Sequence, residues 1–114
     1  MRLDIHSQSR LRADLRSSIA RRLRFVLGRS GNRVQSATVR LWDESDGPGE
    51  LAKRCEIVVR LAPRRTVSVE DAAESFPSVV RRVTDRIGRS VQRELERPLA
   101  GISTDPVRTP ARGS

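Results

Sequence analysis

The sequence has few of the residues that catalytic centres, metal sites and disulfide frameworks need. Its 114 residues include one cysteine, one histidine and no tyrosine, and aromatic residues make up only 3% of the chain. A single cysteine excludes an internal disulfide, and one cysteine with one histidine is too little for a zinc site of the usual spacing. No apolar run approaches the roughly 20 residues that span a bilayer. We therefore expect no metal, no cofactor, no small-molecule substrate and no membrane insertion.

The single cysteine has no catalytic partners that the sequence reveals. Cys55 lies on the apolar side of an alternating segment, which favours a buried structural thiol. A Cys55–His6 pair would lack an identifiable orienting carboxylate and an oxyanion hole. The acidic segment 43–50 is typical of a solvated, turn-rich loop. We therefore expect no catalytic residue and predict that the protein is not an enzyme.

The apolar periodicity predicts six elements in the order β-α-β-β-β-α. Apolar residues that alternate with polar ones predict strands, and apolar residues three and four apart predict amphipathic helices. The predicted strands cover residues 1–6, 37–42, 55–61 and 67–69, and the predicted helices cover 10–27 and 76–97. We expect residues 7–9 to cap the first helix and the acidic residues 70–75 to precede and cap the second.

Each predicted strand has one apolar face, and each predicted helix has one apolar stripe. Both helices should therefore cover the same side of a four-stranded mixed sheet, which gives an α+β two-layer sandwich. Leu41, Ile57, Val59 and Val83 are expected in its core. Residues 1–97 should form this domain.

The first and last segments of the sequence indicate the cellular compartment and the end of the folded domain. Residues 1–5 alternate and show no signal-peptide core, so we expect a cytoplasmic protein. Residues 98–114 contain three prolines and two glycines, which is typical of a flexible tail.

The charge balance is strongly basic. Lys and Arg number 23 against 14 Asp and Glu, for a net charge of +9. An excess of this size indicates a polyanionic partner, of which nucleic acid is the usual one. Residues 10–29 carry +6 and residues 76–97 carry +3, whereas residues 30–75 carry −1. Because a solvated helix face usually mixes both signs, we expect the two helices to present a joint arginine surface.

Within each predicted helix the arginines occupy defined positions. At about 100° per residue, four arginines of the second helix fall within about 60° of one another, beside the apolar stripe. On the first helix, Arg10, Arg21 and Arg24 lie opposite the stripe, and Arg16 and Arg22 flank it. The four on the second helix are Arg82, Arg86, Arg89 and Arg93.

The scarcity of aromatic residues limits how such a surface would recognise nucleic acid. Only Trp42 is expected on the open face of the sheet, which disfavours a platform that stacks successive bases. Recognition of phosphates and shape in folded RNA fits the sequence better, although charge alone does not separate RNA from DNA. Membrane binding is disfavoured because each helix uses its apolar side for the core.

Several local motifs occur in a characteristic order. They are 39–43 (VRLWD), 46–49 (DGPG) and 53–57 (KRCEI) in the central hairpin, with 21–25 (RRLRF) and 85–89 (DRIGR) in the helices. In these motifs the chain resembles the bacterial ribosome-hibernation factors, also called ribosome-associated inhibitor, ribosomal subunit interface or sigma-54 modulation proteins. The resemblance covers about residues 1–97.

The resemblance implies a fold similar to a double-stranded-RNA-binding domain and a role in translation. Such proteins bind the small ribosomal subunit between head and body, over the mRNA and tRNA positions, and silence ribosomes under stress or in stationary phase. It implies contacts to 16S rRNA phosphates from Arg22, Arg24, Arg29, Arg82, Arg86, Arg89 and Arg93. Arg16 and Arg21 complete the predicted RNA-binding set because of the charge pattern.

Two further points follow from the resemblance. The chain is similar to the short members, which lack a second, dimerising domain, so we expect a monomer when free; whether it pairs ribosomes or acts on single ones stays open. The alternative function is a regulator that binds a protein, such as an alternative sigma factor, or another RNA-binding module. The segregated arginine surface favours rRNA, because a protein partner offers less regular negative charge.

Overall fold

The alternating segments form a sheet and the two amphipathic segments form helices, in the predicted order. The computed structural model describes residues 1–8, 10–44 and 52–97, so residues 98–114 and most of the acidic segment 43–50 lie outside the described residues. The strands are β1 (Arg2–Ser7), β2 (Val34–Asp43), β3 (Lys53–Leu61) and β4 (Arg65–Ala73). The helices are α1 (Ala13–Leu27), the 3-10 segment η1 (Gly28–Arg33) and α2 (Phe76–Glu96).

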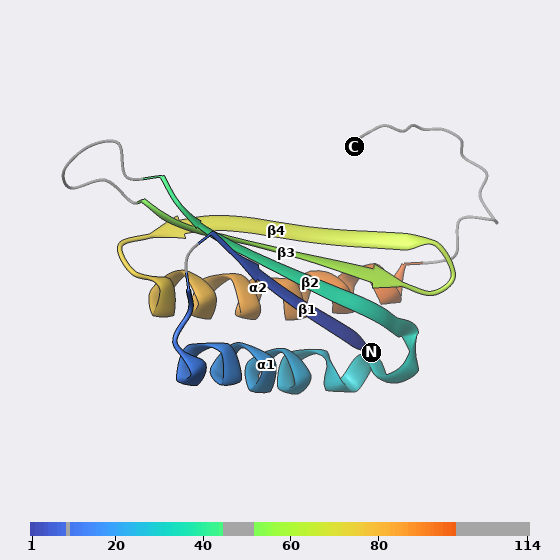
Figure 1. Cartoon of the computed structure of the whole chain (residues 1–114). Helices are drawn as coiled ribbons and strands as arrows, with labels where there is room; N and C mark the ends of the chain where they lie inside the picture. The colour runs from blue at the N-terminus through green and yellow to red at the C-terminus, as the bar shows by residue number, and fades with distance from the viewer. Residues whose placement is uncertain (9, 45–51, 98–114) are drawn as a thin grey trace.

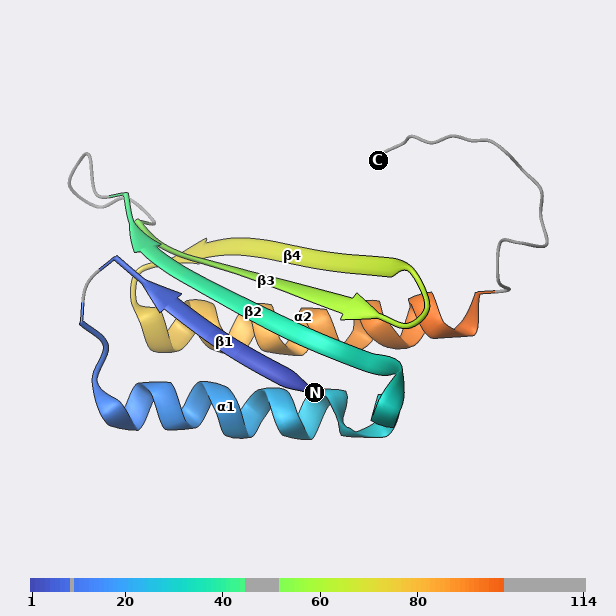
Figure 2. The same cartoon turned by 45° about the vertical axis from the view of Figure 1, so that its right-hand side comes forward.

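The strands lie side by side in chain order, β1-β2-β3-β4. β1 runs parallel to β2, and the other two pairs are antiparallel. Both helices cover one face of this sheet and run in the same direction, as Figures 1 and 2 show from two angles. The α+β two-layer sandwich predicted from the sequence is therefore confirmed.

The core lies between the sheet and the two helices. Leu41, Ile57, Val59 and Val83, which the alternation places inside, are at most 2% exposed. α1 contributes Ile19 to the same cluster, with no exposed area. The period of the sequence therefore predicted the buried side of each element correctly.

The first helix begins later than predicted. Its N-cap is Arg12, without a side-chain hydrogen bond, and the predicted caps at 7–9 are wrong as far as Ser7 and Gln8 are described. Ser7 is still paired with Leu41 in the sheet, and the Gln8 amide donates to the Leu41 carbonyl at 3.3 Å. Sheet pairing keeps these residues extended, and the helix starts only after Leu11 has reached the core, where it is 9% exposed.

β4 is longer than predicted, because it includes most of the acidic segment 70–75. Residues 70–73 pair with 53–56 of β3. The Arg54 guanidinium donates to Glu70 at 3.1 and 2.8 Å, which balances the acidic charge on the open face. The capping prediction holds at Ser75, whose hydroxyl accepts from the Ser78 amide at 3.2 Å at the start of α2.

A glycine allows the two helices to approach closely. Gly88 lies in the middle of α2, where glycine costs about 1 kcal/mol relative to alanine. A Cβ atom at Gly88 would lie 3.0 Å from the Cβ of Val26 on α1, which is closer than normal packing. The helix contact therefore explains why a residue with poor helix propensity occupies this position.

Candidate nucleic-acid interface

A groove lies between the C-terminal part of α1 and the C-terminal half of α2. Its volume is about 810 Å³. Four of the predicted arginines line it, and two acidic residues stand among them. The residues that line it include Arg24, Phe25, Val26, Arg29, Asp85, Gly88, Arg89, Arg93 and Glu96. We call Arg24, Arg29, Arg89 and Arg93 the groove arginines.

Local structure explains how the two helices form this groove. They approach each other closely at Gly88 and Val26, both of which line it. α1 ends at Leu27, and the turn of η1 uses Gly31 at a φ of 55°, a value that favours glycine. η1 is held against α2 by a hydrogen bond from the Gln92 amide to the Ser30 hydroxyl at 3.4 Å. This contact carries Arg29, in the same segment, to the groove.

Arg22 holds the two helices together. Its Nε donates to the Thr84 hydroxyl at 2.9 Å, and its Nη2 donates to Asp85 at 2.8 Å. Thr84 has no exposed area and donates its own hydroxyl proton to the Val80 carbonyl at 2.7 Å. The Arg22 side chain is 36% exposed. Much of its hydrogen-bonding capacity is thus used inside the fold, next to the groove.

Arg16 lies on the opposite flank of α1 from α2. Its Nη1 donates to the Ile5 carbonyl of β1 at 3.4 Å. Arg21 is exposed on the same helix. The structure places neither residue in the lining of the groove.

The arginines at the start of the α2 ladder reach toward β4. Arg82 donates to the Ala72 carbonyl at 3.1 Å, and Arg86 to Asp71 at 3.4 Å. Arg89 and Arg93 lie on the next turns and line the groove. The ladder predicted from the helical wheel is therefore one stripe on α2 with two different surroundings, the β4 edge and the groove.

Phe25 is a candidate residue that the sequence analysis missed. It is 85% exposed and lines the groove beside the groove arginines. It lies two residues after Leu23 and two before Leu27, so it points about 160° away from each of them on the helix. An aromatic residue outside the apolar stripe of an amphipathic helix is the signal in the sequence that indicates this exposed ring.

Most charged side chains on the open face of the sheet are paired, although exposed Arg60 of β3 lies on the same face. Arg40 lies 3.8 Å from Glu56, and Arg54 bridges Glu70 and Glu44. Trp42 is half-buried and donates its indole N–H to Glu44 at 2.9 Å. It lies beside Arg40 and His6, on the open face as predicted. This face therefore offers little unbalanced positive charge.

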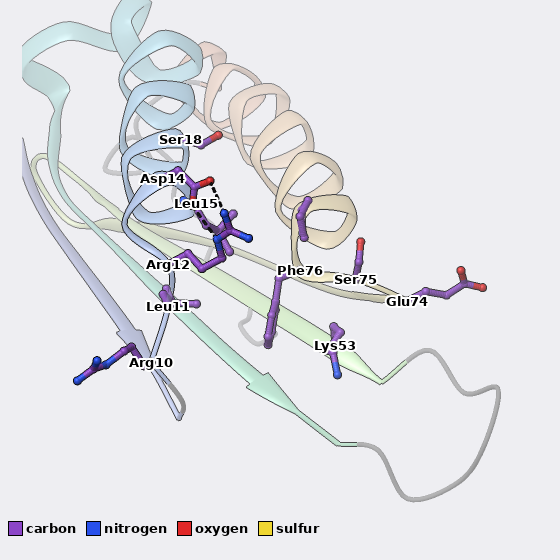
Figure 3. A pocket seen from close by; sticks show the side chains of 11 residues that line it. Arg10, Leu11, Arg12, Asp14, Leu15, Ser18, Lys53, Glu74, Ser75 and Phe76 are labelled. Atoms are coloured by element: carbon purple, nitrogen blue, oxygen red, sulfur yellow. Dashed lines mark hydrogen bonds and ion pairs between the residues drawn. The ribbon is translucent and has the colours of Figure 1, made fainter.

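A second cavity, of about 550 Å³, lies where both helices begin (Figure 3). Arg12 pairs with its neighbour Asp14 at the start of α1, with Nε 3.3 Å from Oδ1 and Nη2 donating to Oδ2 at 3.4 Å. Lys53 is ion-paired with Asp43, and its ammonium lies 5.7 Å from the centre of the Phe76 ring. Two of the cations lining this cavity thus have partners within the chain.

Cys55 is buried in β3, as predicted. It has no exposed area, and desolvation, with a smaller contribution from Glu56, raises the pKa of its thiol to about 12. A thiol in this state is a poor nucleophile. Within residues 1–8, 10–44 and 52–97, no three acidic, His or Cys side chains are grouped to hold a metal ion, and neither helix is long and apolar enough to cross a membrane.

No family model and no curated protein matches this sequence. Solved structures do match its fold. The N-terminal domain of Protein Y from Thermus thermophilus superposes with a TM-score of 0.67 at 21% identity, over 82% of this chain and 99% of that one. A ribosomal subunit interface protein from Coxiella burnetii superposes with a TM-score of 0.67 at 12% identity, over 84% of this chain and 100% of that one. The resemblance seen in the motifs is thus confirmed at the level of the fold.

Proposed function

We propose that this protein is a ribosome-associated hibernation factor. It binds 16S rRNA of the small subunit through the outer side of α1 and α2, covers the mRNA and tRNA channel, and silences translation without catalysis. We also propose that the protein acts in the cytoplasm, where ribosomes are found. The fold shared with a ribosomal subunit interface protein supports it.

The observation that carries the proposal is the position of the unbalanced positive charge. The groove arginines come from two helices and one connecting segment and surround a single concavity. Asp85 at this groove is already engaged by Arg22. Guanidinium groups form strong, bidentate hydrogen bonds with phosphate, and a folded RNA offers several phosphates at once to such a cluster. The open face of the sheet, where most charges are paired, is suited to solvent.

The number of arginine–phosphate contacts can be measured from salt dependence. Each contact contributes about 0.7 to 0.9 to the slope of log affinity against log salt. Replacing both Arg89 and Arg93 by glutamine should therefore flatten the slope for purified small subunits by about 1.4 to 1.8. Both side chains are exposed, so the fold should be retained.

The matched control removes two other exposed arginines. Arg60 and Arg64 lie on β3 and in the β3–β4 turn, away from the groove. Arg65 is unsuitable, since its side chain is only 14% exposed and binds Glu94. The control double variant loses the same charge but should keep nearly the wild-type slope. Equal slopes for the two double variants would contradict the proposed site, and absence of sedimentation with small subunits would contradict the function.

Inhibition of translation in a purified system provides the second measurement. The Arg89→Gln/Arg93→Gln variant should need a higher concentration than the control variant to inhibit. Inhibition that follows total charge and not position would indicate nonspecific binding to RNA.

A further inference from the structure

We propose that Phe25 stacks on an unpaired base of the RNA held by the groove arginines. The inference rests on the proposed function and adds a second mode of recognition to it. The groove would then bind a nucleotide turned out of a helix, as well as phosphates. This differs from the expectation, based on the few aromatic residues, that only phosphates and shape are recognised.

The exposure of Phe25 separates it from the other aromatic residues. Phe76 packs partly against the core, and Trp42 is half-buried with its N–H bonded to Glu44. Phe25 is 85% exposed and lies in the last turn of α1. Both of its faces are therefore open to a planar ligand to an extent that the other two rings do not match.

The surroundings of Phe25 fit a nucleotide better than an apolar ligand. Four guanidinium groups line the same groove, and the floor is the apolar contact between Val26 and Gly88. A nucleotide has the matching parts, a planar base with an apolar face and a phosphate on either side. RNA-binding proteins recognise unpaired bases in this way, by stacking on aromatic rings with arginine at the backbone.

A regular RNA duplex would use only part of this groove. Its stacked bases would leave the ring of Phe25 without a partner, while its phosphates still reached the arginines. A loop or bulge offers both the phosphates and a free base face. With one exposed ring, the groove accommodates one such base, which is consistent with the absence of a stacking platform.

Conservative variants of Phe25 distinguish stacking from simple apolar contact. Leucine keeps the apolar volume and loses the ring, whereas tyrosine keeps the ring. We expect Phe25→Leu to weaken binding to purified small subunits roughly 5- to 150-fold, the range for loss of one stacked base. Phe25→Tyr should stay within about 3-fold of wild type, on the same stacking principle. The salt slope should be unchanged in both, because no phosphate contact is removed.

Trp42→Leu is the matched control, since it removes an aromatic ring from the opposite side of the molecule. It should bind as wild type does, and melting curves of all three variants should confirm that each is folded. Wild-type affinity of Phe25→Leu would overturn the inference, because an apolar contact with a ribosomal protein tolerates leucine.

Photocrosslinking identifies the partner directly. Ultraviolet irradiation of the complex with small subunits should attach a nucleotide to the tryptic peptide 25–29 (FVLGR), in which Phe25 is the only aromatic residue. A ribosomal-protein adduct on this peptide, or an adduct only elsewhere in the chain, would overturn the inference. If Phe25→Leu binds normally while the Arg89→Gln/Arg93→Gln variant does not, the inference fails and the proposed function stands. If the wild-type chain does not bind small subunits, the proposed function itself fails.

Discussion

Replacing Arg22 with methionine should destabilise the fold, although Arg22 lies in the predicted RNA-binding set. Methionine keeps most of the length and apolar packing of the arginine stem but cannot donate hydrogen bonds. The variant would remove the Nε contact to Thr84 at 2.9 Å and the Nη2 contact to Asp85 at 2.8 Å. Both contacts join α1 to α2.

The expected loss of stability in Arg22→Met follows from how exposed the two contacts are. A hydrogen bond with a charged group contributes about 1.5–3 kcal/mol, and the lower end applies here because Arg22 reaches solvent. The pair with Asp85, whose side chain is 48% exposed, contributes no more than about 1 kcal/mol. We therefore expect the free energy of unfolding to fall by about 1.5–2.5 kcal/mol. The melting temperature of a domain of this size should fall by about 4–8 °C for each kcal/mol.

Urea denaturation followed by circular dichroism measures this loss, with Arg21→Met as the matched control. Arg21 is the exposed neighbour on the same helix, and its replacement should change stability by less than about 0.5 kcal/mol. Double-mutant cycles with Thr84→Val and with Asp85→Asn apportion the two contacts. The coupling to Asp85 should weaken at high salt, and the coupling to Thr84 should persist.

Equal stability of the Arg22→Met and Arg21→Met variants would refute this account of the helix contact. So would a larger coupling to Asp85 than to Thr84. If the account holds, ribosome binding by Arg22 variants must be measured where they are fully folded, because lost affinity would otherwise include lost structure.

Three further predictions concern the core and the helix contact. Ile57→Ala should lower the unfolding free energy by about 2–5 kcal/mol, and a wild-type melting temperature would contradict its burial. Because the pKa of Cys55 is raised to about 12, wild-type stability should be complete below the ordinary value of 9.0 and fall as pH rises from there toward 12. Cys55→Ala should lack that decline, and identical pH profiles in urea titrations would exclude the raised pKa. Gly88→Ala should lower the melting temperature, because the new Cβ would lie 3.0 Å from the Cβ of Val26. Helix propensity alone would instead raise the free energy of unfolding by about 1 kcal/mol.

The sequence alone was sufficient for features that depend on a local period. Alternation placed Leu41, Ile57 and Val59 inside, and the spacing of apolar residues defined α2 from Phe76 to within one residue of its end at Glu96. The excess of arginine in and beside the two helices was also assigned from the sequence, although Arg10, Arg12 and Arg29 lie outside α1 itself. These features are readable because each strand or helix has a single buried side, which a period of 2 or 3.6 residues reveals.

Element boundaries depended on contacts between elements. The start of α1 moved to Ala13 because Ser7 pairs with Leu41 of β2 and the Gln8 amide donates to the Leu41 carbonyl. β4 extended to Ala73 because β3 provides a partner as far as Lys53. A short sequence window does not contain the partner strand, so capping and turn preferences indicated different ends.

The chemistry of the arginines was decided by the tertiary structure. Arg22 bonds residues 62 and 63 positions away in the chain, and Arg82 and Arg86 meet the β4 edge while Arg89 and Arg93 meet the groove. A helical wheel gives the direction of a side chain from its own axis but not what lies in that direction. The sequence therefore determined which helices are basic, and only the packing of α1 against α2 determined which arginines remain available around Phe25.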